Sequence, residues 1–147
     1  MGFEKKSRPM ARAYRSTAQT IANNTLTALS MDGQLYDTDG MFTPTDTKIY
    51  AKRFSGYYFI NGACSFVANA TGERLVGIKK NAAVYLAVHQ CAPNPSDAVT
   101  VLNVSTVEYF AVNEYIELFV RQQSGGNLDT YPDIADTYLA LAHLSGR

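Results

Sequence analysis

The most constraining feature of the sequence is a series of short runs in which apolar and polar residues alternate. Turn-forming residues separate the runs, and no segment keeps a helical period over ten residues. Alternation with a period of two is typical of β-strands, and its recurrence predicts an all-β sandwich or barrel of about eight or nine strands. Seven of these runs occupy residues 24–31, 56–68, 74–80, 83–91, 99–110, 114–123 and 137–144.

The length of the chain, 147 residues, suits a single domain. Residues 1–10 are polar and basic, and we interpret them as an extended N-terminal arm that precedes one domain at residues 11–147. Formal net charge is zero, so composition gives no case for nucleic-acid binding. No apolar run approaches the roughly 18 residues that a membrane span needs, and no membrane partner is expected.

Positive charge is concentrated at the start of the chain. Residues 1–15 hold five basic residues against Glu4, which gives 5 − 1 = +4, and the remainder is mildly acidic. Such an arm can order against an acidic neighbour, or it can remain a solvated tail. The basic residues that would make the contact are Lys5, Lys6, Arg8, Arg12 and Arg15.

Two predicted strands are apolar on both faces. In residues 114–123 one face is aliphatic, yet Tyr115 and Phe119 lie on the other. Tyr57 and Phe59 also share a strand face opposite a second apolar pair. Each sheet of a two-sheet sandwich normally has one polar face, so the extra apolar residues need cover from a partner subunit or from loops.

Four motifs follow one another along the chain: Tyr36, Asp37, Gly40 and Phe42, then Gly56, Tyr57 and Phe59, then residues 115–118, and last residues 138–144. Their order resembles the jelly roll of complement globular heads and tumour-necrosis-factor-like domains. The resemblance covers about residues 11–144. It implies a ten-stranded antiparallel jelly-roll sandwich that forms a homotrimer, with outward aromatic residues at the three-fold axis. Tyr57, Phe59, Tyr115 and Phe119 are the trimer-interface residues that it predicts.

Three further segments, at residues 11–29, 66–81 and 116–128, resemble domains of tailed-phage virion proteins. The resemblance implies a virion structural protein, made in the host cytoplasm, that decorates and stabilises the capsid exterior. Its partners would be further copies of itself and the major capsid protein or another virion protein, which the basic arm would contact. The alternative is a receptor-binding tip or tail-fibre-associated adhesin that recognises host glycan through residues 122–127 and 130–133.

The residues give little support to an enzyme, and no cofactor is expected. His89 and His143 each lie inside a strand-like run, without metal-ligand spacing to each other or to a cysteine. There is no Gly-x-Ser-x-Gly elbow and no phosphate-binding loop that opens a helix. Cys64 and Cys91 are too few for a disulfide framework, and we expect free thiols.

The sequence "LYDTDGMFTP" at residues 35–44 offers the clearest candidate for a metal site. Asp37 and Asp39 supply oxygen ligands, but calcium prefers about six to eight, so both are weak candidates. Asp-Thr-Asp-Gly is also a good turn sequence, and we favour the turn. A second acidic loop, which holds Asp129, Asp133 and Asp136, is similarly interpreted as a solvated loop.

Overall fold

The computed structural model describes residues 7–95 and 98–145, and all regular structure in these ranges is β-strand. Ten strands there form two five-stranded antiparallel sheets, and two more form a small third sheet. The described ranges contain no helix long and apolar enough to cross a membrane. The strands are β1 Met10–Tyr14, β2 Thr20–Ile21, β3 Thr27–Ala28, β4 Gly33–Asp37, β5 Lys48–Tyr50, β6 Gly56–Phe66, β7 Arg74–Lys80, β8 Val84–Cys91, β9 Thr100–Phe110, β10 Tyr115–Gln122, β11 Leu128–Asp129 and β12 Tyr138–Ser145.

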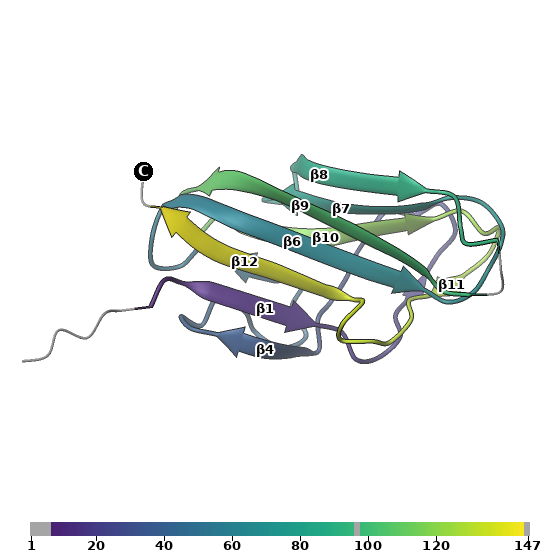
Figure 1. Ribbon diagram of the computed structural model, residues 1–147, viewed down its shortest axis with the longest axis horizontal. Helices are drawn as coiled ribbons and strands as arrows, with labels where there is room; N and C mark the ends of the chain where they lie inside the picture. The colour runs from purple at the N-terminus through teal and green to yellow at the C-terminus, as the bar shows by residue number, and fades with distance from the viewer. Residues whose placement is uncertain (1–6, 96–97, 146–147) are drawn as a thin grey trace, which may run out of the picture.

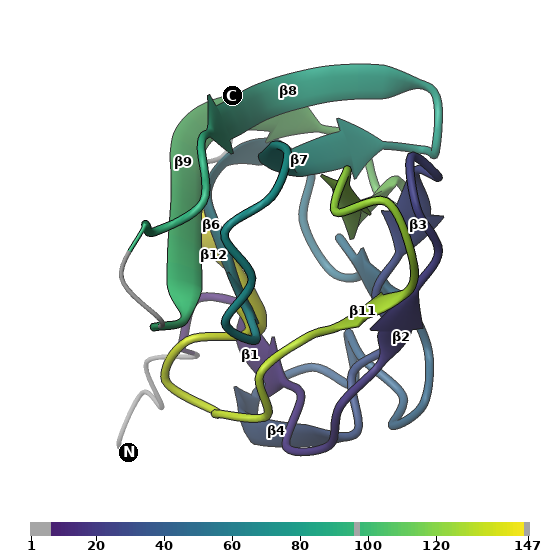
Figure 2. The same ribbon diagram turned by 90° about the vertical axis from the view of Figure 1, so that its right-hand side faces the viewer.

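The two large sheets face each other. The first sheet has the order β4-β1-β12-β6-β9, and the second has the order β3-β10-β7-β8, with β5 also paired to β10. Figure 1 shows β1, β12, β6 and β9 side by side in one layer, with β7 and β10 in the layer behind. Figure 2 shows β8 and β9 adjacent where the layers meet. There the His89 ring of β8 contacts the backbone of Asn103 in β9, with Nδ1 3.2 Å from the carbonyl oxygen.

The core lies between the two sheets and follows from the alternation within each strand. Tyr58 and Ile60 of β6 point inward and are fully buried, as are Leu118 and Val120 of β10. Each such side chain contributes about 1.5–3 kcal/mol to folding when it leaves water. The Tyr58 hydroxyl also donates a hydrogen bond to the carbonyl of Phe54 at 2.6 Å, so the buried oxygen is satisfied.

Most of the long predicted strands are present, and the differences are confined to short ones. The run at residues 24–31 contributes only the two-residue β3, because most of its backbone forms no ladder. The sequence also missed β1, β2, β4, β5 and β11, whose two to five residues are too few for alternation to be recognised. β1 begins at Met10, the last residue of the predicted arm.

A tight loop before β7 encloses a buried cation. Arg74 is fully buried, and its guanidinium donates to the carbonyl oxygens of Asn69, Thr71 and Glu73 at 2.8–3.1 Å. Burial lowers the pKa of Arg74 from its usual range. Gly72 allows this loop to close, because its φ is +73° and a Cβ there would lie 1.6 Å from the carbonyl oxygen of Gln123.

Replacement of Gly72 by alanine should therefore destabilise the protein by about 2 kcal/mol or more, since left-handed strain and steric overlap act together. Urea unfolding at equilibrium measures the change. Gly40→Ala is the matched control: Gly40 has φ +64°, but nothing lies within 4 Å of the position that a Cβ would take, so only the strain remains. Equal losses in the two variants would contradict the role given to the overlap.

Candidate functional site

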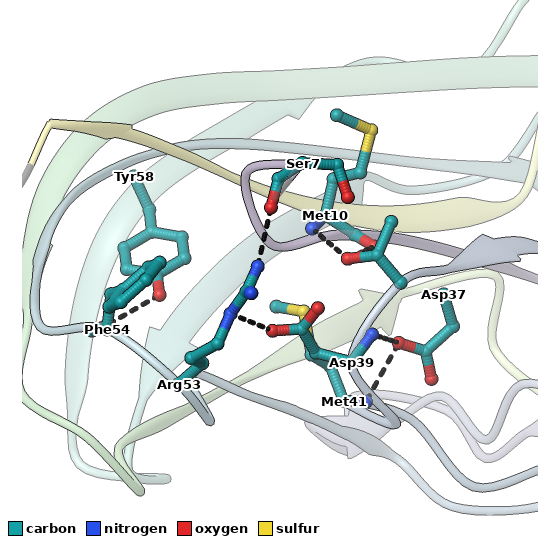
Figure 3. Close-up of polar contacts among 9 residues, drawn as sticks. Ser7, Met10, Asp37, Asp39, Met41, Arg53, Phe54 and Tyr58 are labelled. Atoms are coloured by element: carbon teal, nitrogen blue, oxygen red, sulfur yellow. Dashed lines mark hydrogen bonds and ion pairs between the residues drawn. The ribbon is translucent and has the colours of Figure 1, made fainter. Parts of the chain in front are cut away.

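The acidic turn at residues 35–44 is organised by its own carboxylates. Asp37 Oδ1 accepts hydrogen bonds from the backbone N–H groups of Met41 at 2.8 Å and Asp39 at 3.3 Å, and Oδ2 accepts from Phe42 at 3.0 Å. Figure 3 shows Asp37 directed at the backbone of the turn. Gly40 takes a positive φ, and Phe42 is buried, so the chain returns to the core. Asp37 thus caps the turn.

The second carboxylate of this turn is held by an ion pair. Asp39 Oδ2 lies 2.7 Å from Nε of Arg53, whose Nη2 also donates to the carbonyl of Ser7 (Figure 3). The two candidate ligands therefore make separate contacts, and they do not converge on one point. Among the described residues, no three acidic, histidine or cysteine side chains are grouped as a metal ion would require.

The second acidic loop also uses its carboxylates locally. Asp129 Oδ1 accepts from the Thr20 hydroxyl at 2.6 Å, and Asp133 Oδ1 accepts from the backbone N–H of Ala135 at 2.8 Å. Gln122, the last residue of β10, is buried and donates to backbone carbonyls, so it is not available to a glycan. Tyr131, by contrast, is exposed.

The titratable residues that an enzyme might use occupy structural positions. His143 is nearly buried, and its ring packs against Phe54 and Tyr58 at centroid distances of 5.5 Å and 5.0 Å. Cys64 is fully buried, and burial raises the pKa of its thiol well above the usual range. Both cysteines are free thiols, as the sequence predicts, because neither forms a disulfide.

A hollow of about 460 Å³ lies beside His143. Its lining is formed by Arg53, Phe54, Ser55, Val112 and His143. Arg53 is already paired with Asp39, so the hollow contains no free cation for an anionic ligand. The His143 ring offers no exposed Nδ1 atom either, because that atom is buried without a hydrogen-bond partner. The hollow therefore lacks a convergent set of polar groups that would fix a ligand.

The outward face of the first sheet exposes several large apolar side chains. We define the apolar face as the outward side chains of β1, β6 and β9 that strand pairing brings together: Tyr57 beside Tyr109, and Phe59 beside Val107, with Met10 two strands away. All five are at least one-third exposed. Register places one charged residue, Arg12, on the outward face of this sheet within the described residues, and its guanidinium stacks on the Tyr138 ring at 4.1 Å.

The four residues predicted at the trimer interface do not form one surface. Tyr57 and Phe59 belong to the apolar face, but Tyr115 and Phe119 lie on β10, in the other sheet. Tyr115 packs against Tyr50, with ring centroids 5.3 Å apart. Alternation shows which residues share a strand face, but it does not show which sheet the strand joins. The same reasoning missed Val107 and Tyr109, which become neighbours of Phe59 and Tyr57 only through strand pairing.

The five basic residues predicted for the arm also do not form one group in the structure. Lys5 and Lys6 lie outside the described residues, and Arg8 is exposed. Arg12 is a residue of β1 that stacks on Tyr138, so it is part of the domain. Arg15 is likewise fixed in place, because its guanidinium donates to the carbonyls of Ser30 and Ala18 and to the Ser30 hydroxyl at 2.7–3.0 Å.

Comparison with known proteins supports the arrangement of strands. No family model and no curated protein matches the sequence. Among solved structures, murine APRIL matches with a TM-score of 0.69 at 9% identity, over 94% of this chain and 100% of that chain. Eiger TNF from S. frugiperda matches with a TM-score of 0.66 at 13% identity, over 95% of this chain and 96% of that one.

The globular domain of zebrafish complement 1qA also matches, with a TM-score of 0.66 at 12% identity, over 95% of this chain and 100% of that chain. The chain has the tumour-necrosis-factor-like jelly-roll fold. The predicted all-β antiparallel jelly roll is therefore confirmed, and so is the resemblance to this fold that the order of the motifs indicated. At these identities the likeness shows the fold alone.

The geometry of the acidic turn predicts that stability is independent of calcium. Neither calcium nor a chelator should shift the thermal midpoint of the parent protein, because Asp37 and Asp39 already bind protein groups. Asp37→Asn should lower stability by about 1–2 kcal/mol, since the amide offers one acceptor oxygen in place of two. Thermal unfolding followed by circular dichroism measures both effects. A chelator that lowers the midpoint of the parent, but not that of Asp37→Asn/Asp39→Asn, would restore the calcium site.

Proposed function

We propose that this chain is a phage virion structural protein that forms a homotrimer and decorates the capsid exterior. Self-association is inferred from the apolar face of the first sheet. Tyr57, Phe59, Val107 and Tyr109 are each more than 40% exposed and adjoin one another on two paired strands. Contiguous exposed apolar patches on soluble proteins commonly mark interaction sites, and aromatic residues are enriched in interface cores.

The scarcity of charge favours a further copy of the chain as the occupant of this face. A surface without fixed charges can be buried against the same kind of surface without leaving ions unpaired in a low dielectric. The number three and the phage context come from the resemblances stated above for the sequence. The matched jelly-roll structures support the fold from which self-association is inferred, and they do not bear on the phage context. The alternation of apolar and polar residues within one chain does not indicate how many copies associate.

A decoration protein acts through binding and needs no chemistry. A trimer that contacts several capsid subunits stabilises the assembled shell by mass action, because it binds the assembled state in preference to the free subunits. The carboxylates of the acidic turn and the two histidines have structural partners, which agrees with such a role. The location on the virion surface forms part of the proposal.

The oligomeric state gives the first test. Light scattering coupled to size exclusion should give three times the 16.1 kDa of one chain. Val107→Glu should dissociate the trimer, because burial of the apolar face would then bury unpaired carboxylates. Val88→Glu is the matched control: Val88 is 49% exposed, compared with 48% for Val107, but it lies on β8 in the other sheet. A parent monomer, or equal dissociation in both variants, would refute the interface.

The location of the protein gives the second test. Capsids assembled without this protein should bind the purified trimer and become more resistant to heat, as measured by release of the packaged nucleic acid. Val107→Glu should lower occupancy on these capsids, since the monomer loses the avidity of three contacts. If the purified protein binds to host cells and not to capsids, the decoration role is wrong and the receptor-binding alternative is favoured.

A further inference from the structure

The positive charges of the domain are distributed unevenly. Beyond residue 15, Arg53 and Lys80 form ion pairs and Arg74 is buried. Every other described lysine and arginine in this part of the chain lies on, or at the margin of, the outward face of the second sheet. We name these residues the basic face: Lys48, Lys52, Lys79 and Arg121.

Strand pairing sets the positions of these charges. Lys48 of β5 and Lys79 of β7 lie on either side of Glu117 of β10. Glu117 is only 5% exposed and accepts a hydrogen bond from the Thr47 hydroxyl at 2.5 Å. Its carboxylate makes no ion pair with either lysine, since Arg53–Asp39 and Lys80–Glu114 are the ion pairs in the described ranges. The basic face therefore presents one exposed and three partly exposed cations beside one largely buried carboxylate.

Aromatic rings support the ammonium groups. Lys48 Nζ lies 4.8 Å from the centroid of Tyr115, and Lys79 Nζ lies 4.6 Å from Tyr85 and 4.8 Å from Phe119. Such cation–π contacts are worth about 0.5–1 kcal/mol at exposed sites. They orient the long side chains before a partner arrives, which reduces the entropy that binding would otherwise cost.

We propose that the basic face binds an acidic protein surface. Orientated cations without carboxylate partners are complementary to exposed Asp and Glu side chains. Val88 and Tyr85, which are exposed on the neighbouring β8, would add apolar contact next to the charges. A sugar polymer fits less well, because the ring faces on which sugars would stack are already covered by Lys48 and Lys79.

This inference does not rest on the proposed function. The basic face and the apolar face lie on opposite sheets, so either surface can be occupied while the other is free. The partner is defined by its carboxylates and need not be a capsid protein. If the chain proves not to be a trimer, the proposal for the basic face is unaffected. If the basic face does not bind an acidic polypeptide, the proposed trimer is likewise unaffected.

The test uses immobilised poly-L-glutamate as the acidic polypeptide and the full chain as the analyte, at near-physiological ionic strength. Lys48→Gln/Lys79→Gln should weaken binding about tenfold or more, because it removes two ammonium groups from the centre of the face. The control Ala18→Glu/Ala135→Glu lowers the net charge by the same two units at exposed positions outside the basic face, and it should change binding by no more than about twofold. Biolayer interferometry measures both affinities, and circular dichroism verifies folding.

A second variant separates loss of charge from loss of structure, because replacement of Lys79 also removes its contacts with two aromatic rings. Lys52→Gln/Arg121→Gln leaves those contacts in place and should weaken binding in the same direction. Equal losses in the face variants and the control would mean that net charge alone matters, which overturns the proposal. Tighter binding to polygalacturonate than to poly-L-glutamate would assign the face to an acidic polysaccharide instead. Absence of saturable binding to poly-L-glutamate would also overturn it.

Discussion

The antiparallel pairing of β6 with β9 is the interaction on which the rest of the structure depends. It runs from Gly56 opposite Phe110 to Phe66 opposite Thr100, along the full length of both strands. This register sends Tyr58 into the core and leaves Tyr57 beside Tyr109 on the outside. A slip of one residue would exchange these two sets of side chains. The same ladder therefore fixes both the core and the apolar face.

The two sheets share one core but present chemically different exteriors. The first sheet exposes aromatic and aliphatic side chains with little charge, whereas the second carries cations held over rings. Tyr115 and Phe119 appear in the sequence as surplus apolar residues, and in the structure they serve as supports for Lys48 and Lys79. Aromatic residues on an outward strand face thus have two different roles within one domain.

The sequence was sufficient for the long strands because alternation over seven or more residues has one simple explanation, a half-buried strand. It was insufficient for the surfaces, since these depend on which strands become neighbours. Arg15 shows the limit for the arm: nothing in the sequence indicates that its guanidinium would bind Ser30. Asp37 was the easier case, because an Asp followed by Gly predicts a capped turn from local chemistry alone.

The loop before β7 encloses a cation in the way that was considered for the acidic turn, and this cation is the side chain of Arg74. Its guanidinium is surrounded by the carbonyl oxygens of Asn69, Thr71 and Glu73, which is how a protein loop commonly surrounds a metal cation. Here the cation is covalently attached to the chain and cannot dissociate or be exchanged. The loop therefore needs no bound metal ion to satisfy these carbonyl oxygens.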